Sequence, residues 1–113
     1  MAVKQARTRA RFLVAFVTCP DRRTAKRLAQ LLVEHRLAAC VNIIGGIESI
    51  YRWQSKVEQA KETLLVIKTT RARYAALEAS IRKHHPYQTP EVIAWPIESG
   101  MRSYLDWVFD SVV

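Results

Sequence analysis

The alternation of apolar runs with amphipathic segments constrains this chain more than any other feature. Residues 12–17, Phe-Leu-Val-Ala-Phe-Val, form an unbroken apolar run rich in β-branched and aromatic side chains, which predicts a strand buried on both faces. Pro20 and Asp21 then favour a helix start, through a fixed φ angle and a negative charge beside the helix N-terminus. Apolar residues follow at helical spacing, at Ala25, Leu28, Ala29 and Leu32. A buried strand is therefore followed by an amphipathic helix, extending to about Arg36, that can cover it.

A long extended segment comes next and predicts a hairpin. Residues 39–53 are expected to be extended, since Val41 and Ile43 alternate with Asn42, and Tyr51 and Trp53 alternate with Arg52. Gly45-Gly46 interrupts the segment as a bulge or bend rather than a chain reversal. Residues 54–56, Gln-Ser-Lys, are the expected turn, and residues 63–67 are the next buried strand. The hairpin is longer than one small sheet requires, and it leaves an unpaired edge of the kind that proteins usually cover. We therefore expect an oligomer whose subunits pair these edges.

The C-terminal half predicts two further helices with a short strand between them. Thr70 is placed to cap a helix that Pro86 ends. Residues 91–95 are the short strand, and Ser99 is placed to cap the last helix. The apolar face expected for that last helix consists of Met101, Tyr104, Leu105, Val108 and Phe109. The element order, β-α-β-β-α-β-α, predicts an α+β ferredoxin-like domain with a long hairpin and an extra C-terminal helix.

Positive charge is concentrated in two places. The chain of 113 residues has 18 Lys and Arg against 10 Asp and Glu, which is a formal net charge of +8. Residues 1–10 are assigned to a basic N-terminal tail, which lacks the apolar core of a secretory signal, and residues 11–113 to a single domain. The basic residues near the N-terminus and at the start of the first helix are Lys4, Arg7, Arg9, Arg11, Arg22, Arg23, Lys26 and Arg27. They form either a solvated surface or a nonspecific site for anions and nucleic acid.

The chain lacks the residues that several classes of function require. The longest uncharged, mostly apolar stretch, residues 37–47, has 11 residues, whereas a membrane span needs about 20. There is no Gly-rich phosphate loop, and Cys19 and Cys40 have no local signature of an activated nucleophile. We expect Cys40 to be a small buried apolar residue. The Gly-Phe-Gly-Phe-like string of RNA-recognition domains is also absent. We therefore expect a cytoplasmic protein that is not an enzyme, has no membrane span and has no specific nucleic-acid partner.

Six strings in fixed order together resemble those of a known family. They are Val-Thr-Cys-Pro-Asp at 17–21, Leu-Ala-Ala-Cys-Val-Asn-Ile-Ile at 37–44, Ser-Ile-Tyr-Arg-Trp at 49–53, Leu-Val-Ile-Lys-Thr at 65–69, His-His-Pro-Tyr-Gln-Thr-Pro-Glu at 84–91 and Tyr-Leu-Asp-Trp at 104–107. Over about residues 12–110 the chain resembles the CutA family of divalent-cation tolerance proteins. The resemblance implies a homotrimer of ferredoxin-like subunits that is associated with copper and other divalent metals and acts in metal tolerance or signalling. It implies no known reaction. The alternative is a trimeric scaffold that anchors a partner protein.

The candidate metal ligands combine this resemblance with residue chemistry. Adjacent His84 and His85 on a helix point about 100° apart, so either would need a partner, such as the Cys19 thiolate or the Glu91 carboxylate. Imidazole and thiolate both suit copper, and we take copper(II) or another divalent cation as the expected ligand. Family members discussed as copper binders carry a cysteine at the position of Val17, which cannot ligate a metal. The alternative is that the histidines only complement the C-terminus of their helix.

A second group of residues predicts a ligand-binding cleft at a subunit boundary. Lys68 offers a cation, Glu91 a carboxylate and His85 an imidazole, while Trp53 and Tyr87 offer amphipathic walls. Such a set suits a small anion or a metal–anion complex. The alternatives are that the two aromatic residues only pack, that Lys68 and Glu91 form a plain salt bridge, and that the His-Pro-Tyr-Gln-Thr-Pro segment is a rigid connector.

Overall fold

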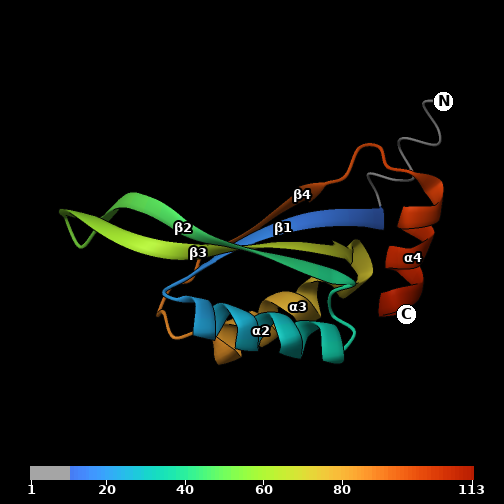
Figure 1. The fold of residues 1–113 in the computed structure, drawn as a ribbon, viewed down its shortest axis with the longest axis horizontal. Helices are drawn as coiled ribbons and strands as arrows, with labels where there is room; N and C mark the ends of the chain where they lie inside the picture. Colours follow the sequence, from blue (N-terminus) through green and yellow to red (C-terminus); the bar gives the residue numbers. More distant parts are fainter. Residues whose placement is uncertain (1–10) are drawn as a thin grey trace.

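The computed structural model describes residues 11–113, and the predicted basic tail, residues 1–10, lies outside them. The elements in chain order are β1 (Phe12–Cys19), α2 (Arg22–Glu34), β2 (Cys40–Trp53), β3 (Lys56–Thr70), α3 (Arg71–His84), β4 (Val92–Pro96) and α4 (Arg102–Val112). The four strands form one antiparallel sheet in the order β2-β3-β1-β4 (Figure 1). This confirms the predicted α+β ferredoxin-like order, the long hairpin and the extra C-terminal helix.

The main core lies between one face of the sheet and the helices α2 and α3. In Figure 1 both helices lie below the sheet, and α4 stands at one end of it. Alternate residues of the central strands face the helices and are fully buried, as at Ala15, Val17, Leu65 and Ile67. Leu28, Leu32, Leu77 and Ile81 meet them from α2 and α3. The residues that the sequence predicted for the apolar side of the first helix, Ala25, Leu28, Ala29 and Leu32, are therefore its buried residues.

Helix α2 begins where the sequence predicts and ends slightly earlier. Asp21 is the N-cap, and its Oδ1 accepts a hydrogen bond from the Thr24 N–H at 2.7 Å. The helix ends at Glu34 rather than near Arg36 because Arg36 adopts a φ angle of +56°, in the left-handed region. The amides of the next two residues turn back to the Leu32 carbonyl, which is typical of a helix C-terminus.

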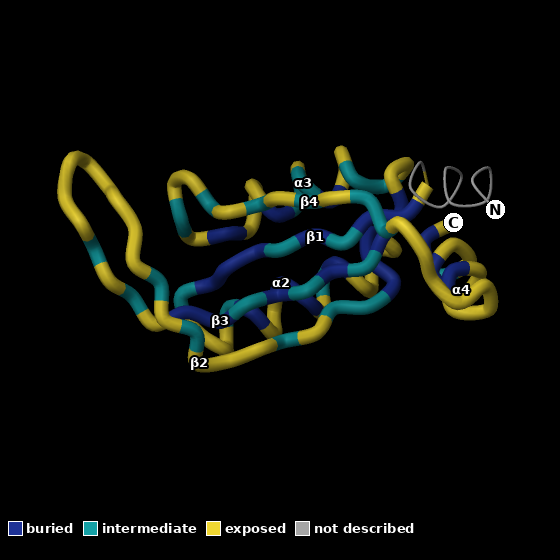
Figure 2. Tube along the Cα trace, turned by 90° about the horizontal axis from the view of Figure 1, so that it is seen from above, coloured by how far each residue is buried: buried dark blue, intermediate teal, exposed yellow. Residues whose placement is uncertain are grey.

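The hairpin of β2 and β3 extends well beyond the body of the domain. A register shift between Ile44 and Ile47 confirms the bulge predicted at Gly45-Gly46, where Gly46 has a φ angle of +72°. Gln54 and Ser55 form the predicted turn, with φ angles of +49° and +68°, as in a two-residue type I′ turn. We call residues 47–61 the arm. None of these residues is buried, and the arm projects from the body as a long hairpin that is largely exposed (Figure 2).

Two sequence predictions about helix caps need correction. Thr70 is the N-cap of α3, but its side chain makes no capping hydrogen bond. Ser99 does not cap α4, because that helix begins at Arg102 with Met101 as its N-cap. The start of α4 is set by packing, since the Leu105 side chain lies against Gly100 and its N–H bonds the Met101 carbonyl.

The buried side of α4 also differs from the predicted one. Leu105, Val108 and Val112 are buried against Phe12 and Ala39. Met101, Tyr104 and Phe109 were expected on that side and are exposed instead. The reason is that α4 covers only the end of the sheet, so a narrow stripe of its surface has anything to pack against.

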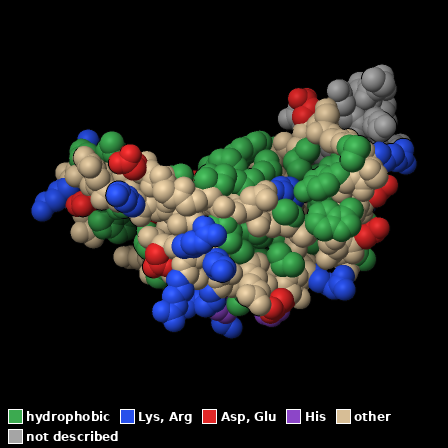
Figure 3. Space-filling model, viewed as in Figure 1, with side chains coloured by type: hydrophobic (Ala, Val, Ile, Leu, Met, Phe, Trp, Pro, Cys, Tyr) green, Lys and Arg blue, Asp and Glu red, His purple; other side chains and the backbone are tan. Residues whose placement is uncertain are grey.

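The face of the sheet opposite α2 and α3 carries several large apolar side chains, together with Asn42 and Lys68. Within residues 11–113, no helix covers the middle of its strands. We call this face the open face. Its exposed members are Ile44, Ile93 and Trp95, with exposed fractions of 47%, 50% and 43%. Phe16 lies among them, opposite Ile93 in the ladder. Its ring packs edge-on against the ring of Trp95, with 4.7 Å between the two ring centroids. In Figure 3 apolar side chains gather on the sheet side of the molecule, whereas Lys and Arg gather below it, over the helices.

Candidate functional site

His85 occupies a buried position between the end of α3 and the end of β1. Its Nε2 lies 2.8 Å from the Thr18 carbonyl oxygen, and its Nδ1 lies 3.1 Å from the Tyr87 amide nitrogen. Because the Tyr87 N–H can only donate, Nδ1 accepts, and Nε2 carries the proton that is donated to Thr18. Both ring nitrogens of the neutral imidazole are therefore used, and neither offers a free lone pair to a metal ion in this conformation.

Tyr87 connects the His-Pro-Tyr segment to the base of the arm. Its hydroxyl donates a hydrogen bond of 2.8 Å to the Oε2 atom of Glu62, and its ring lies 4.8 Å from the His85 ring. Glu62 is buried where β3 enters the body. Burial, followed by this carboxylate partner, raises the pKa of the Tyr87 hydroxyl. Glu62 was missing from the sequence prediction, and its only signal was a charged residue directly before the buried run 63–67.

Cys19 is fully buried at the end of β1, opposite Thr63. Its side chain joins the same core as Val17, on the helix side of the sheet. Burial raises the pKa of the Cys19 thiol to about 11, with smaller contributions from the carboxylates of Asp21 and Glu62. The group is therefore a neutral thiol at physiological pH, whereas metal ligation requires the thiolate. Cys40, which was expected to be buried, is half-buried.

His84 differs from its neighbour in having one ring nitrogen available. It is the last residue of α3, and its exposed ring donates from Nδ1 to the Ser80 carbonyl oxygen at 2.9 Å. The Nε2 lone pair is left for another partner. Glu91 is exposed at the other end of the His-Pro-Tyr connector. Within residues 11–113, no three His, Cys, Asp or Glu side chains are grouped so that they could hold a metal ion.

The residues of the predicted cleft are not brought together within one chain. Lys68 lies near the base of the hairpin, opposite Cys40 and Val14, and its Nζ donates to the Asn42 side-chain oxygen. Trp53 lies at the tip of the arm, opposite Lys56. Lys68 lies 12 residues after Lys56 in β3, which corresponds to about 40 Å of extended strand. A cleft containing both Trp53 and Lys68 would therefore need residues from two subunits.

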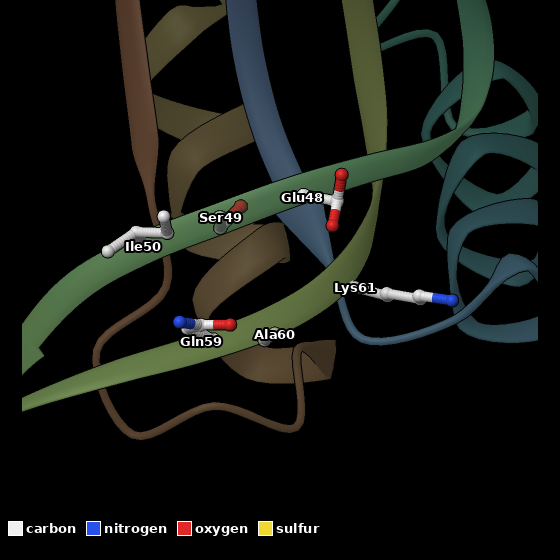
Figure 4. Close-up of a pocket in the computed structure, with 6 residues that line it drawn as sticks. All are labelled: Glu48, Ser49, Ile50, Gln59, Ala60 and Lys61. Atoms are coloured by element: carbon white, nitrogen blue, oxygen red, sulfur yellow. The ribbon is translucent and has the colours of Figure 1, made fainter.

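The described part of the surface includes two shallow hollows, and neither of these corresponds to the predicted cleft. One lies on the arm, where Glu48 and Lys61 are directly opposite each other in the ladder, and Ile50 and Gln59 form the next pair on the same face (Figure 4). The other lies between the end of α3 and the connector, lined by Ala79, Arg82, Lys83, Gln88 and Pro90. Both are open to solvent and contain few convergent polar groups, unlike the enclosed pockets that hold small molecules.

Comparison with known proteins agrees with the strings found in the sequence. A family model described as CutA1 divalent ion tolerance protein matches residues 13–111. The chain belongs to this family. It is 51% identical over 94 residues to Protein CutA of Mus musculus, covering 83% of this chain and 53% of that protein. It is 47% identical over 95 residues to the divalent-cation tolerance protein CutA of Thermus thermophilus, covering 84% of this chain and 92% of that protein. The chain thus spans about half the length of the mouse relative and nearly all of the bacterial one.

Solved structures of the CutA1 family share the fold described above. The Thermus thermophilus protein superposes with a TM-score of 0.88 at 44% identity, over 90% of this chain and 99% of that chain. CutA1 from Oryza sativa superposes with a TM-score of 0.89 at 43% identity, over 94% and 97%. The family model and the bacterial relative are both named for divalent-ion tolerance. In the described part of the chain, no helix is long and apolar enough to cross a membrane.

Proposed function

We propose that this CutA1 protein is a homotrimer that catalyses no reaction and acts in the divalent-metal response. In this proposal it binds copper(II) or another divalent cation, or a small anionic complex of one, at its subunit boundaries. The observation that carries the proposal is the apolar open face of the sheet. An antiparallel sheet with one face in solvent normally alternates apolar and polar side chains, whereas here large apolar side chains also lie on the open face, beside Asn42 and Lys68.

The open face has the composition of an association surface. Ile44, Ile93 and Trp95 are large apolar side chains that remain 43–50% exposed, with Phe16 and Val66 half-buried beside them. Contiguous exposed apolar side chains on this scale mark interaction sites in soluble proteins. Self-association buries them and supplies the second layer that the sheet otherwise lacks on this side.

The exposed apolar side chains of the arm also support self-association. Ile50 and Val57 are 72% and 65% exposed, and Tyr51 and Trp53 are also exposed. A two-stranded ribbon is at best marginally stable in water without something to pack against. In the proposed assembly, the arm of one subunit lies on the body of the next. That arrangement carries Trp53 to a boundary with the neighbouring subunit, where a cleft with Lys68 and Tyr87 can form.

The proposed metal ligand from the histidine pair is His84. Its Nε2 is the unused ring nitrogen of the pair, since both nitrogens of His85 bind backbone groups. Imidazole nitrogen is a favoured ligand for copper(II). One histidine is not a complete site, so the remaining ligands come from a neighbouring subunit, and Glu91 is the nearby carboxylate that we assign to the boundary.

Native mass spectrometry with and without one equivalent of copper(II), and then zinc(II), tests the proposal. We expect a mass three times 13.0 kDa with discrete metal uptake. His84→Ala is expected to lose that uptake, whereas His35→Ala, which removes another exposed histidine, is the matched control and is expected to keep it. A trimer of the His84→Ala variant that binds copper as tightly as wild type would show that the site is misassigned. A trimer without specific uptake would favour the scaffold role, and a monomer would overturn the architecture.

A further inference from the structure

The excess positive charge of the described chain lies in one layer of the fold. Helices α2 and α3 together contain eight Lys and Arg residues and only two acids, Glu34 and Glu78. The remaining residues between 11 and 113 contain seven basic and eight acidic side chains. We call the outward-facing side of the two helices the basic layer. Its basic residues are Arg22, Arg23, Lys26, Arg27, Arg71, Arg73, Arg82 and Lys83. All are exposed except Arg73, which is half-buried and donates from its Nε to the Arg36 carbonyl oxygen at 3.1 Å.

The start of α2 holds four of these charges in an arrangement that opposes helix stability. Arg22, Arg23, Lys26 and Arg27 are all exposed and fall within two turns. The spacing makes two like-charged i, i+4 pairs, which destabilise a helix, and the charges lie at the positive end of the helix dipole. Asp21 partly offsets them, since its cap hydrogen bonds and then Arg23 and Arg27 lower the pKa of its carboxyl group. A locally unfavourable arrangement of this kind is typical of a functional surface.

We propose that the basic layer binds the phosphate backbone of double-stranded nucleic acid without reading its sequence. Six of the eight cations are arginines, whose planar guanidinium groups match phosphate oxygens well. Backbone binding of this kind needs only correctly placed cations and no contact to the bases.

The other anionic partners need side chains that this layer lacks. Among the large apolar side chains of α2 and α3, which are both described throughout, only Val33 is exposed. Single-stranded nucleic acid is normally held by stacking on exposed aromatic rings. Stable protein interfaces have an apolar core, and membrane-bound helices insert an apolar face. The other exposed apolar side chains of the two helices are the small alanines Ala72, Ala75, Ala76 and Ala79 of α3. The scarcity of large apolar side chains among the cations therefore favours a duplex backbone over these alternatives.

The basic layer remains available when the protein associates through the open face. The helices lie on the opposite side of the sheet from that face (Figure 1), and the Lys and Arg side chains gather on the helix side of the surface (Figure 3). The two surfaces are therefore separate, and the duplex-binding proposal does not depend on metal binding.

Fluorescence anisotropy with a labelled duplex of about 24 base pairs and arbitrary sequence tests the proposal. The full chain is titrated in EDTA over a series of NaCl concentrations from 50 to 300 mM. We expect a Kd of about 10⁻⁴ to 10⁻⁶ M at 150 mM salt, with log K falling linearly against log salt concentration. Arg22→Gln, Arg23→Gln, Lys26→Gln and Arg27→Gln, combined in one variant, is expected to weaken binding at least tenfold. Its salt slope should become shallower by up to about 3.6, since each of the four phosphate contacts contributes about 0.9.

Two further variants separate the basic layer from net charge and from the tail. The variant with Arg52→Gln, Lys56→Gln, Lys61→Gln and Arg102→Gln removes the same charge from the arm and α4, and we expect it to bind within twofold of wild type. A variant with Lys4→Gln, Arg7→Gln and Arg9→Gln tests the N-terminal residues. Circular dichroism checks that each variant is folded.

Four results would overturn the proposal. They are no duplex binding at 150 mM salt up to about 1 mM protein, an equal loss in the α2 variant and its charge-matched control, loss of binding only in the tail variant, and tighter binding of another polyanion. The polyanions compared are single-stranded DNA, phosphatidylserine vesicles and polyglutamate.

Discussion

The two faces of the sheet are built from the same four strands but differ in what covers them. On the helix side, Val17, Leu65 and Ile67 are fully buried beneath α2 and α3. On the open face, the neighbouring residues Phe16 and Val66 are half-buried, and Ile93 and Trp95 are about half exposed. Both faces carry large apolar side chains, although the open face also carries Asn42 and Lys68. Within the described residues, α2 and α3 complete the first face, whereas in our proposal another chain completes the second.

The most disruptive test of this contrast places charge on the open face. Combining Ile93→Lys with Trp95→Lys is expected to abolish the proposed self-association, because burying two unpaired cations costs several kcal/mol each. Sedimentation equilibrium should then report the mass of one subunit. Val33→Lys, at an exposed apolar position on α2, is the control and should leave the assembly intact. An unchanged mass for the double variant would place the interface elsewhere.

The covered face is tested by removing volume from its core. Leu65→Ala is expected to lower the free energy of unfolding by about 2–5 kcal/mol, since the side chain is fully buried and leaves a cavity. Urea denaturation measures the loss under conditions where the protein is monomeric. Ile93→Ala on the open face should cost less than about 1 kcal/mol in the same assay. Equal losses at the two positions would contradict the contrast between the faces.

A smaller effect is expected at the junction between the arm and the body. Tyr87→Phe removes the hydrogen bond to buried Glu62, and we expect a loss of about 1–3 kcal/mol in unfolding free energy because the carboxylate loses its partner. Tyr74→Phe is the matched control. Its hydroxyl bonds Glu78 one turn away on the same helix at 3.1 Å, and such pairs contribute only about 0.2–0.5 kcal/mol. If both variants lose the same unfolding free energy, the Glu62 carboxylate has another hydrogen-bond donor.

The smallest predicted effect is a loss of unfolding free energy at alkaline pH, caused by Cys19 on the covered face. The pKa of the Cys19 thiol is raised from 9.0 to about 11 by burial, so the folded state keeps its proton to a higher pH than the unfolded state does. The associated stability is complete below pH 9 and is lost progressively between pH 9 and 11. We expect a loss of at most about 2.7 kcal/mol in unfolding free energy, since each pKa unit corresponds to about 1.36 kcal/mol, and urea denaturation at a series of pH values measures it. Cys19→Ala should reduce the slope of unfolding free energy against pH in this range, whereas Cys40→Ala should leave that slope unchanged.

Much of the fold was predictable because its signals are local. The strand predicted at residues 12–17, the helix start predicted at Pro20-Asp21 and the Gly45-Gly46 bulge each depend on a few adjacent residues, and all are confirmed. The turn predicted at residues 54–56 is also local, but only Gln54 and Ser55 form it, because β3 begins at Lys56. Ser99 shows the limit of the same reasoning. A good capping residue precedes α4, yet the helix starts at Arg102 because Leu105 packs against Gly100.

The site was less predictable because it depends on contacts between distant segments. The sequence shows His84 and His85 as equivalent neighbours, but His85 bonds Thr18, 67 residues away, and so loses its free nitrogen. Glu62 becomes important only because Tyr87, 25 residues further on, reaches it. The assignment of Glu91, Lys68 and Trp53 to a shared cleft stays a prediction about two subunits.

The sequence by itself determined the order of the elements, the two apolar faces of the sheet and the family, since periodicity and short strings are properties of neighbouring residues. Only the tertiary structure decided which polar groups are already satisfied. Hydrogen-bond partners, burial and the ionisation of Cys19 depend on which strands and helices meet, and that is set by packing over the whole chain. It also decided that the basic residues form one layer on the side opposite the open face.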